Sequence, residues 1–180
     1  EIYTANIVAA SDVYKRQDRV NEAVSKLNLS DEDVIINIQG DEPFINPEDI
    51  NNLFDLVSKK EIAMGTLYSD LKSLDELEDS NKVKILVNDG IASNFFRETS
   101  LVNNIFIHQG VYAFKYKTLK SFVSWQPSDN EKKYKLEQFR ALDNGIKINA
   151  IKSVSKIHLG VDTEDDLKKA NEIAKDDSYK

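Results

Sequence analysis

Two acidic residues stand where apolar segments of the sequence end. Asp41 follows the aliphatic run at 34–38 and Gly40, and Asp162 follows the distant segment IHLGV. In α/β sheets the carboxyl ends of the strands form the ligand crevice, so we expect both acids at that edge. Two carboxylates repel each other unless a cation lies between them, and Mg²⁺ prefers such hard oxygen ligands. The pattern therefore predicts a Mg²⁺ site formed by Asp41 and Asp162.

Each acid also has a structural explanation. Asp162 could precede a helix and interact with its positive N-terminal end, and Glu42 before Pro43 could be a turn residue. A strand that ends on an acid also resembles a Walker B aspartate. However, the sequence has no GxxxxGKS or GxxxxGKT segment, which argues against a P-loop NTPase. The pattern alone leaves the metal site and the structural roles open.

Two further segments carry polar residues that could contact a hydroxylated ligand. His108, together with Gln109 and Tyr112, forms a polar face on an expected strand, although a lone histidine in a strand is more often structural. Glu137 and Gln138 lie in YKLEQFRAL, where a solvated helix face would explain them as well. The sequence contains no HExxH or GxGxxG motif and no Ser-His-Asp order.

Composition limits the class of protein. The 180 residues are 41% hydrophobic, which is enough for one core, so we expect a single domain over 1–180. A net charge of −7 argues against a nucleic-acid partner, and the absence of Cys excludes disulfides and Cys-based metal sites. No apolar run approaches the roughly 18 residues of a membrane helix, and no leader resembles a signal peptide. We therefore expect a cytoplasmic protein without membrane insertion.

Hydrophobic periodicity predicts a mixed α/β fold with a parallel core and an antiparallel insertion. Helices are expected over 18–27, from Pro47 with Asn46 as N-cap, over 118–125, over 130–144 closed by Gly145, and after Thr163, where Asp166 would complete a capping box. Strands are expected over 34–38, 62–68, 105–114, 146–151 and 157–161, with a hairpin over 82–96 around Asp89 and Gly90. The apolar run at 34–38 predicts a strand buried on both faces in a parallel sheet. Leu167, Ala170 and Ile173 are expected to face inward on the last helix.

Five segments in register resemble the 3-deoxy-manno-octulosonate (Kdo) cytidylyltransferase family. They are INIQGDEPFINPEDI, NKVKILVN, HQGVYAFKYKTL, KLEQFRALDNGIKI and GVDTEDDL, within about residues 18–175. The first segment alone is also compatible with related sugar nucleotidyltransferases. The patterns HxGxYAF and LEQxRAL restrict the resemblance to the Kdo cytidylyltransferase family. The resemblance implies a nucleotide-diphospho-sugar transferase fold, a Rossmann-like three-layer sandwich. It also implies a homodimer that joins CTP and Kdo into CMP-Kdo and pyrophosphate for lipopolysaccharide biosynthesis.

The resemblance also implies roles for the matching residues. Asp41 and Asp162 match the catalytic Mg²⁺ ligands, and Asp18 and Arg19 match the end of a nucleotide-contacting segment. The implied sugar contacts are Gln39, Arg97, His108, Tyr112, Glu137 and Gln138. Among them, His108 and Glu137 would orient sugar hydroxyls, and Arg97 would balance the Kdo carboxylate.

The chain departs from the family pattern in several segments. The family's opening PARxxSxRxPGKP loop, which cradles the triphosphate, has no counterpart, and SDVYKRQ at 11–17 matches nothing expected. FFRETS lacks the SRxxIP pattern around Arg97, and VDTEDD replaces VDTPED. We therefore expect an N-terminally truncated member, misjoined over 1–17, without the first strand and the triphosphate loop, and impaired and marginally stable. Alternatives are a cytidylyltransferase for an acylneuraminate or an amino-substituted Kdo, or a non-catalytic dimerising module.

Overall fold

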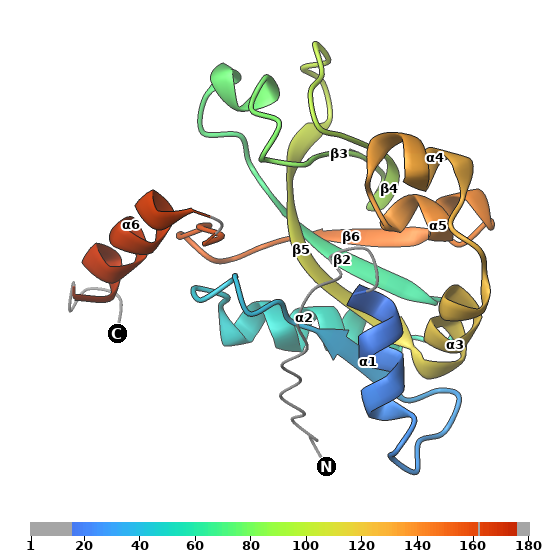
Figure 1. Ribbon diagram of the computed structural model, residues 1–180. Coiled ribbons are helices and arrows are strands. Elements are labelled where there is room, and N and C mark those ends of the chain that lie inside the picture. The colour runs from blue at the N-terminus through green and yellow to red at the C-terminus, as the bar shows by residue number, and fades with distance from the viewer. Residues whose placement is uncertain (1–15, 162, 176–180) are drawn as a thin grey trace.

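A mixed sheet is the centre of the computed structural model, which describes residues 16–161 and 163–175 (Figure 1). Its strands are β1 (Val34–Asn37), β2 (Met64–Ser69), β3 (Lys84–Asn88), β4 (Ile91–Phe96), β5 (Ile105–Lys115) and β6 (Ile148–Lys152). Their order is β1-β5-β2-β6-β4-β3, and β5 also pairs with β3. Within this part of the chain, β2 and β6 run parallel and the other strand pairs are antiparallel.

Helices cover both faces of the sheet, which gives the expected three layers (Figure 1). They are α1 (Arg16–Val24), α2 (Pro47–Ser58), the 3₁₀ helix η2 (Leu74–Leu77), α3 (Tyr116–Ser124), α4 (Asp129–Tyr134), α5 (Gln138–Asp143) and α6 (Glu164–Lys175). One apolar cluster joins α1, α3 and α5 to the sheet, and a second joins α2 to the other face. Helix α6 lies to one side of the sheet in Figure 1.

Several local predictions are confirmed by backbone geometry. Asn46 caps α2 by accepting a hydrogen bond from the Glu48 amide at 2.9 Å. The β3–β4 hairpin turns at Asp89 and Gly90, whose φ angles of 49° and 73° give the positive values that a tight hairpin requires. Gly145 has a φ of 78° just after α5, as expected of a residue that ends a helix. The expected capping box is present at the start of α6, where the Asp166 amide donates to Thr163 Oγ1 at 3.2 Å and the Thr163 amide donates to Asp166 Oδ2 at 3.1 Å.

The prediction for the 34–38 run is wrong in two respects. β1 pairs antiparallel with β5, with Val34 opposite Lys115, and it is an edge strand among the described strands. All four of its residues are half-buried, and Ile38 beyond it is 45% exposed. A continuous aliphatic run is equally compatible with a short edge strand, so composition alone did not define its neighbours.

Three further predictions are corrected. The helix expected over 130–144 is interrupted between α4 and α5, because Lys135 adopts the left-handed conformation with a φ of 55°. Residues 157–161 form no strand and belong to a loop. Leu167, expected to face inward, is 46% exposed, whereas Ala170 is buried.

Candidate functional site

A two-residue bulge in β5 organises one part of the candidate site. Where the register shifts at Thr66, β5 residues Gly110 and Val111 have no partner in β2. Side chains bind their carbonyls instead: Gln39 Nε2 donates to Gly110 O at 2.6 Å, and Thr66 Oγ1 donates to Val111 O at 2.8 Å. A Cβ at position 110 would lie 2.7 Å from Gln39 Nε2, so this close approach requires glycine. The bulge thus positions the candidate sugar contact Gln39.

His108 and Tyr112 lie on either side of this bulge. The His108 ring is 5.2 Å from the ring of Tyr112, and it also meets the ring of Phe95 edge-on at 5.2 Å. His108 Nε2 lies 3.0 Å from Thr66 Oγ1. Burial lowers the pKa of His108 to about 3, so the ring is neutral near pH 7. The structure therefore brings two of the expected sugar contacts together on one face.

Glu137 and Gln138 lie at the start of α5. Glu137 is partly buried, and its Oε1 atom makes no hydrogen bond to any residue in the described ranges. Burial raises the pKa of Glu137 to about 7, while the positive charge of Arg140, 3.8 Å away, opposes that rise. Gln138 is buried. The ring of Phe139, the next residue, packs edge-on against the ring of Phe95, with 6.4 Å between the ring centres. Because Phe95 also packs against His108, the start of α5 lies on the same face as His108.

The first turn of α1 reaches the Glu137 carboxyl. A backbone hydrogen bond from Gln17 binds this carboxyl, and the negative charge of Asp18 contributes to its raised pKa. Asp18 and Arg19 are both half-buried. Residues assigned to nucleotide and to sugar are therefore neighbours at this point of the fold.

The guanidinium of Arg97 forms hydrogen bonds with three backbone carbonyls. It donates to Ser80 O at 3.1 Å, Lys135 O at 3.2 Å and Tyr134 O at 3.4 Å, while the side chain remains exposed. In this structure Arg97 therefore ties the turn after η2 to the α4–α5 junction, ahead of Glu137.

The carbonyl of Arg97 is held in turn by a buried lysine. The Lys84 side chain is fully buried, and its ammonium donates to Asp79 O at 2.7 Å, Lys82 O at 2.8 Å and the carbonyl of Arg97. These three acceptors match the three N–H donors of an ammonium group. Burial lowers the pKa of Lys84. Lys84 thereby fixes the backbone from which Arg97 extends.

Asp41 lies in the turn after β1, beside the loop at 153–161. Its carbonyl accepts a hydrogen bond from the Val161 amide at 2.8 Å. Further along, Ser155 Oγ donates to Phe44 O at 3.3 Å. Asp162 lies outside the described residues, so the expected carboxylate pair remains a prediction. Within 16–161 and 163–175, no group of three or more His, Cys, Asp or Glu side chains could hold a metal.

Asp49 anchors the same loop, a role that its position in the sequence does not reveal. Its side chain is fully buried in the first turn of α2. Oδ2 accepts from Ser153 Oγ at 2.6 Å, and Oδ1 accepts from the Val154 amide at 2.7 Å. An acid in the first turn of a helix is ordinarily explained by the helix dipole, so nothing in the sequence pattern distinguishes Asp49 from such an acid.

Gln109 and His158 form another link between β5 and this loop. The Gln109 amide contacts His158 Nδ1, and Gln109 is buried. Burial is the main cause that lowers the pKa of His158, and the nearby Lys72 lowers it further. The polar residues expected together on β5 therefore have different contacts. Gln109 binds His158 of the loop at 153–161, whereas the His108 and Tyr112 rings pack against each other.

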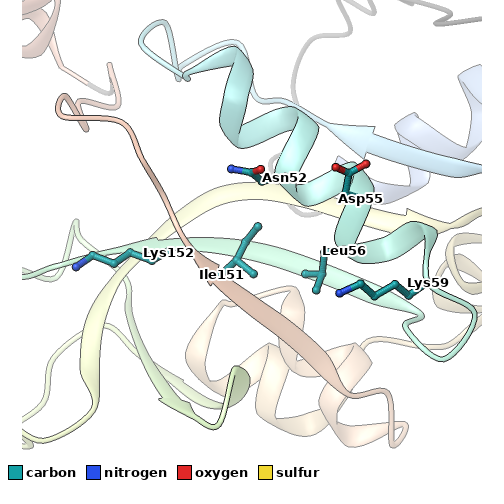
Figure 2. Close-up of a pocket in the computed structure, with 6 residues that line it drawn as sticks. All are labelled: Asn52, Asp55, Leu56, Lys59, Ile151 and Lys152. Carbon is teal, nitrogen blue, oxygen red and sulfur yellow. The ribbon is translucent and has the colours of Figure 1, made fainter.

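A pocket of about 290 Å³ lies between α2 and β6 (Figure 2). It is lined by Asn52, Asp55, Leu56, Lys59, Ile151 and Lys152, none of which is a candidate site residue. No helix in the described part of the chain has the length and apolar character needed to cross a membrane.

The fold is that of nucleotidyltransferases. A solved CMP:2-keto-3-deoxy-manno-octonic acid synthetase complexed with CTP superposes with a TM-score of 0.77 at 28% identity, covering 88% of this chain and 67% of that chain. The 2-C-methyl-D-erythritol 4-phosphate cytidylyltransferase of Francisella tularensis shares the fold with a TM-score of 0.60 at 19% identity, covering 87% and 66% of the two chains.

Sequence comparisons give the family. The cytidylyltransferase family model matches residues 5–148. A 3-deoxy-manno-octulosonate cytidylyltransferase 2 from Actinobacillus pleuropneumoniae serotype 5b (strain L20) is 36% identical over 87% of this chain and 68% of its own. A 3-deoxy-manno-octulosonate cytidylyltransferase from Francisella tularensis subsp. holarctica (strain OSU18) is 32% identical over 96% of this chain and 75% of its own. The chain belongs to the cytidylyltransferase family and is a nucleotidyltransferase enzyme.

Proposed function

We propose that the protein transfers the cytidylyl group of CTP to Kdo, giving CMP-Kdo and pyrophosphate for lipopolysaccharide biosynthesis. The names of the two relatives and the CTP complex of the similar structure support this reaction. The structural observation that carries it is the hydrogen bond from Val161 to Asp41, because it joins the two loops from which the expected carboxylates come.

The candidate sugar residues support recognition of a hydroxylated acid. Gln39, His108 and Tyr112 meet around the β5 bulge, and His108 is neutral and suited to hydrogen-bond a hydroxyl group. Glu137 lies near Asp18, so sugar and nucleotide would meet at the start of α5. The protein would mainly align the anomeric hydroxyl with the α-phosphorus, since positioning alone lowers such a barrier strongly.

The turn that carries Asp41 suits a divalent cation. Its carboxylate supplies hard oxygen ligands, and Asp162 directly follows Val161, whose amide is bonded to that turn. Asp41 and Asp162 would hold Mg²⁺, which when bound neutralises phosphate charge and lowers the pKa of a nearby hydroxyl.

Assembly as a homodimer and a cytoplasmic location are parts of the same proposal. The homodimer is what the family resemblance implies, since a single exposed apolar side chain such as Leu167 on α6 does not by itself mark an interface. Light scattering on the purified protein would give the mass of a dimer. A monomer at all concentrations would contradict this part.

The reaction is tested by pyrophosphate release from CTP, Mg²⁺ and Kdo. We expect weak turnover that requires all three, in line with the impaired activity predicted from the sequence, with CMP-Kdo identified by mass spectrometry. Equal turnover with N-acetylneuraminate or an amino-substituted Kdo would overturn the assigned sugar. Binding without turnover for any sugar would favour a non-catalytic module.

A further inference from the structure

The hydroxyl of Thr66 has three hydrogen-bonding neighbours in β5. Oγ1 lies 2.8 Å from Val111 O, the nearer of two carbonyls, 3.4 Å from Gln109 O, and 3.0 Å from His108 Nε2. Thr66 is fully buried, so bulk water does not compete for its hydroxyl. The Val111 carbonyl is available because the bulge removes it from the β2 ladder. The proton positions in this chain of three groups can be deduced.

The direction of the hydrogen bonds follows from the number of protons. A carbonyl only accepts, so the single hydroxyl proton of Thr66 is donated to Val111 O. The oxygen of Thr66 then accepts from His108, and Nε2 must carry a proton. A neutral imidazole has one N–H, so His108 Nδ1 carries a lone pair.

The surroundings keep this imidazole neutral. Burial lowers the pKa of His108, and no charged group within 16–161 and 163–175 contributes to the shift. The ring packs against Phe95 and Tyr112. Within the described ranges, Thr66 is the one side chain that forms a hydrogen bond with His108, and this bond uses Nε2. Nδ1 is therefore left for a ligand.

We propose that Thr66 is a positioning residue that holds His108 as the Nε2–H tautomer, so that Nδ1 accepts a hydrogen bond from a substrate hydroxyl. The deduction of the tautomer rests on geometry, and only the identity of the hydroxyl as one of Kdo rests on the proposed function. A ligand that presents a carboxylate or an ether oxygen at this point meets a lone pair and is disfavoured. Thr66 thus contributes to specificity without touching the substrate.

Nitrogen NMR of the imidazole rings tests the tautomer without any assay of activity. The sequence contains two histidines, so His158→Gln assigns the His108 signals. We expect the Nε2–H pattern in the parent and in Thr66→Ser, which keeps the hydroxyl. Thr66→Val removes it at similar size and should give a mixture of tautomers. A Nδ1–H tautomer in the parent, or an unchanged pattern in Thr66→Val, would overturn the proposal.

Kinetics test the consequence for the substrate. We expect Thr66→Val to raise the KM for Kdo about tenfold, as loss of one oriented hydrogen bond would, with the KM for CTP changed less than twofold. Thr66→Ser should restore the parent values. Equal increases for both substrates, or no rescue by serine, would indicate a merely structural role and contradict the proposal. If the parent shows no turnover with Kdo, the proposed function fails, and the NMR result alone decides the role of Thr66.

Discussion

The candidate sugar contacts and the candidate metal ligand rest on different kinds of support. His108 and Tyr112 are fixed by the strand register of β5, and Gln39, which follows β1, is bound to the β5 bulge through its side chain. Asp41 lies in a turn whose neighbouring loop, 153–161, has no regular structure and is held by individual hydrogen bonds. The strand-built part should therefore tolerate single changes, whereas the loop-built part should depend on a few polar side chains.

The largest effect is expected at Asp41 itself. Asp41→Asn should lower turnover at least about 100-fold, because the uncharged amide oxygen lacks the negative charge with which a carboxylate holds Mg²⁺. Thermal stability should change little. Pyrophosphate release measures the effect, and Glu48→Gln, at an exposed acid in the first turn of α2, is the matched control. Turnover retained within tenfold would exclude Asp41 as a metal ligand.

Removing the buried anchor of the loop should come next. Asp49→Ala leaves the Ser153 hydroxyl and the Val154 amide without their acceptor, and we expect a loss of about 2–3 kcal/mol of unfolding free energy. Turnover should fall with it, because the loop leads to Asp162. Urea unfolding measures the loss. Ser153→Ala keeps the bond from the Val154 amide to Asp49 and should cost less, although it also removes the bond that Ser153 Oγ accepts from the Ser155 amide. No measurable loss in Asp49→Ala would show that the loop does not depend on Asp49.

The start of α5 gives a pH-dependent comparison. Burial raises the pKa of Glu137 from 4.5 to about 7, so between these pH values the folded protein keeps a proton that the unfolded chain has lost. By linkage, the stability contributed by this group is present below pH 4.5 and is lost as the pH rises through 7. Glu137→Gln should remove this dependence, with a relative gain on the order of 1–3 kcal/mol at pH 8. Urea unfolding at pH 5 and pH 8 measures it. A parallel pH profile for both proteins would show that Glu137 is not buried as described.

The smallest effect is expected at the bulge. Gly110→Ala places a Cβ against Gln39 Nε2, and the amide should move away at a cost of about 1 kcal/mol for the lost hydrogen bond. The KM for Kdo should rise more than the KM for CTP. Gly40→Ala is the control, because a Cβ there meets nothing within 4 Å. Equal effects of the two substitutions would mean that the Gln39 contact is unimportant.

The sequence predicts the locally encoded features of the fold well, but not the neighbours of β1, which is an antiparallel edge strand among the described strands. Asn46 before Pro47 and Asp89 before Gly90 act through local chemistry, and the structure has the expected cap and hairpin. The break at Lys135 could not be predicted, because a lysine with positive φ carries no local signal. It depends on tertiary bonds instead. Arg97 binds the carbonyl of Lys135, and Arg140 of α5 forms a buried ion pair with Glu131 of α4 at 2.5 Å.

Sequence patterns did not predict the contacts of the loop at 153–161 beside Asp41. The apolar residues at 157–161 predicted a strand, yet this segment is a loop in which the Val161 amide donates to the Asp41 carbonyl, and Ser155 just before it binds the Phe44 carbonyl through its side chain. Asp49 looks like an ordinary first-turn acid, and its burial is set by Ser153 and Val154, about a hundred positions away. The neighbourhood of Asp41 and Val161 was expected, but the contacts that produce it involve residue types common in any loop.

The ammonium of Lys84 has a consequence for chemical labelling. All three of its protons are donated to carbonyls inside the protein, so the group stays a buried ammonium, which has no lone pair with which to attack an amine-reactive reagent. Exposed lysines such as Lys60 and Lys147 will be acylated within moments, whereas Lys84 will be modified only when the hairpin opens. Mass spectrometry of this single site would therefore time the opening of the β3–β4 hairpin that supports Arg97.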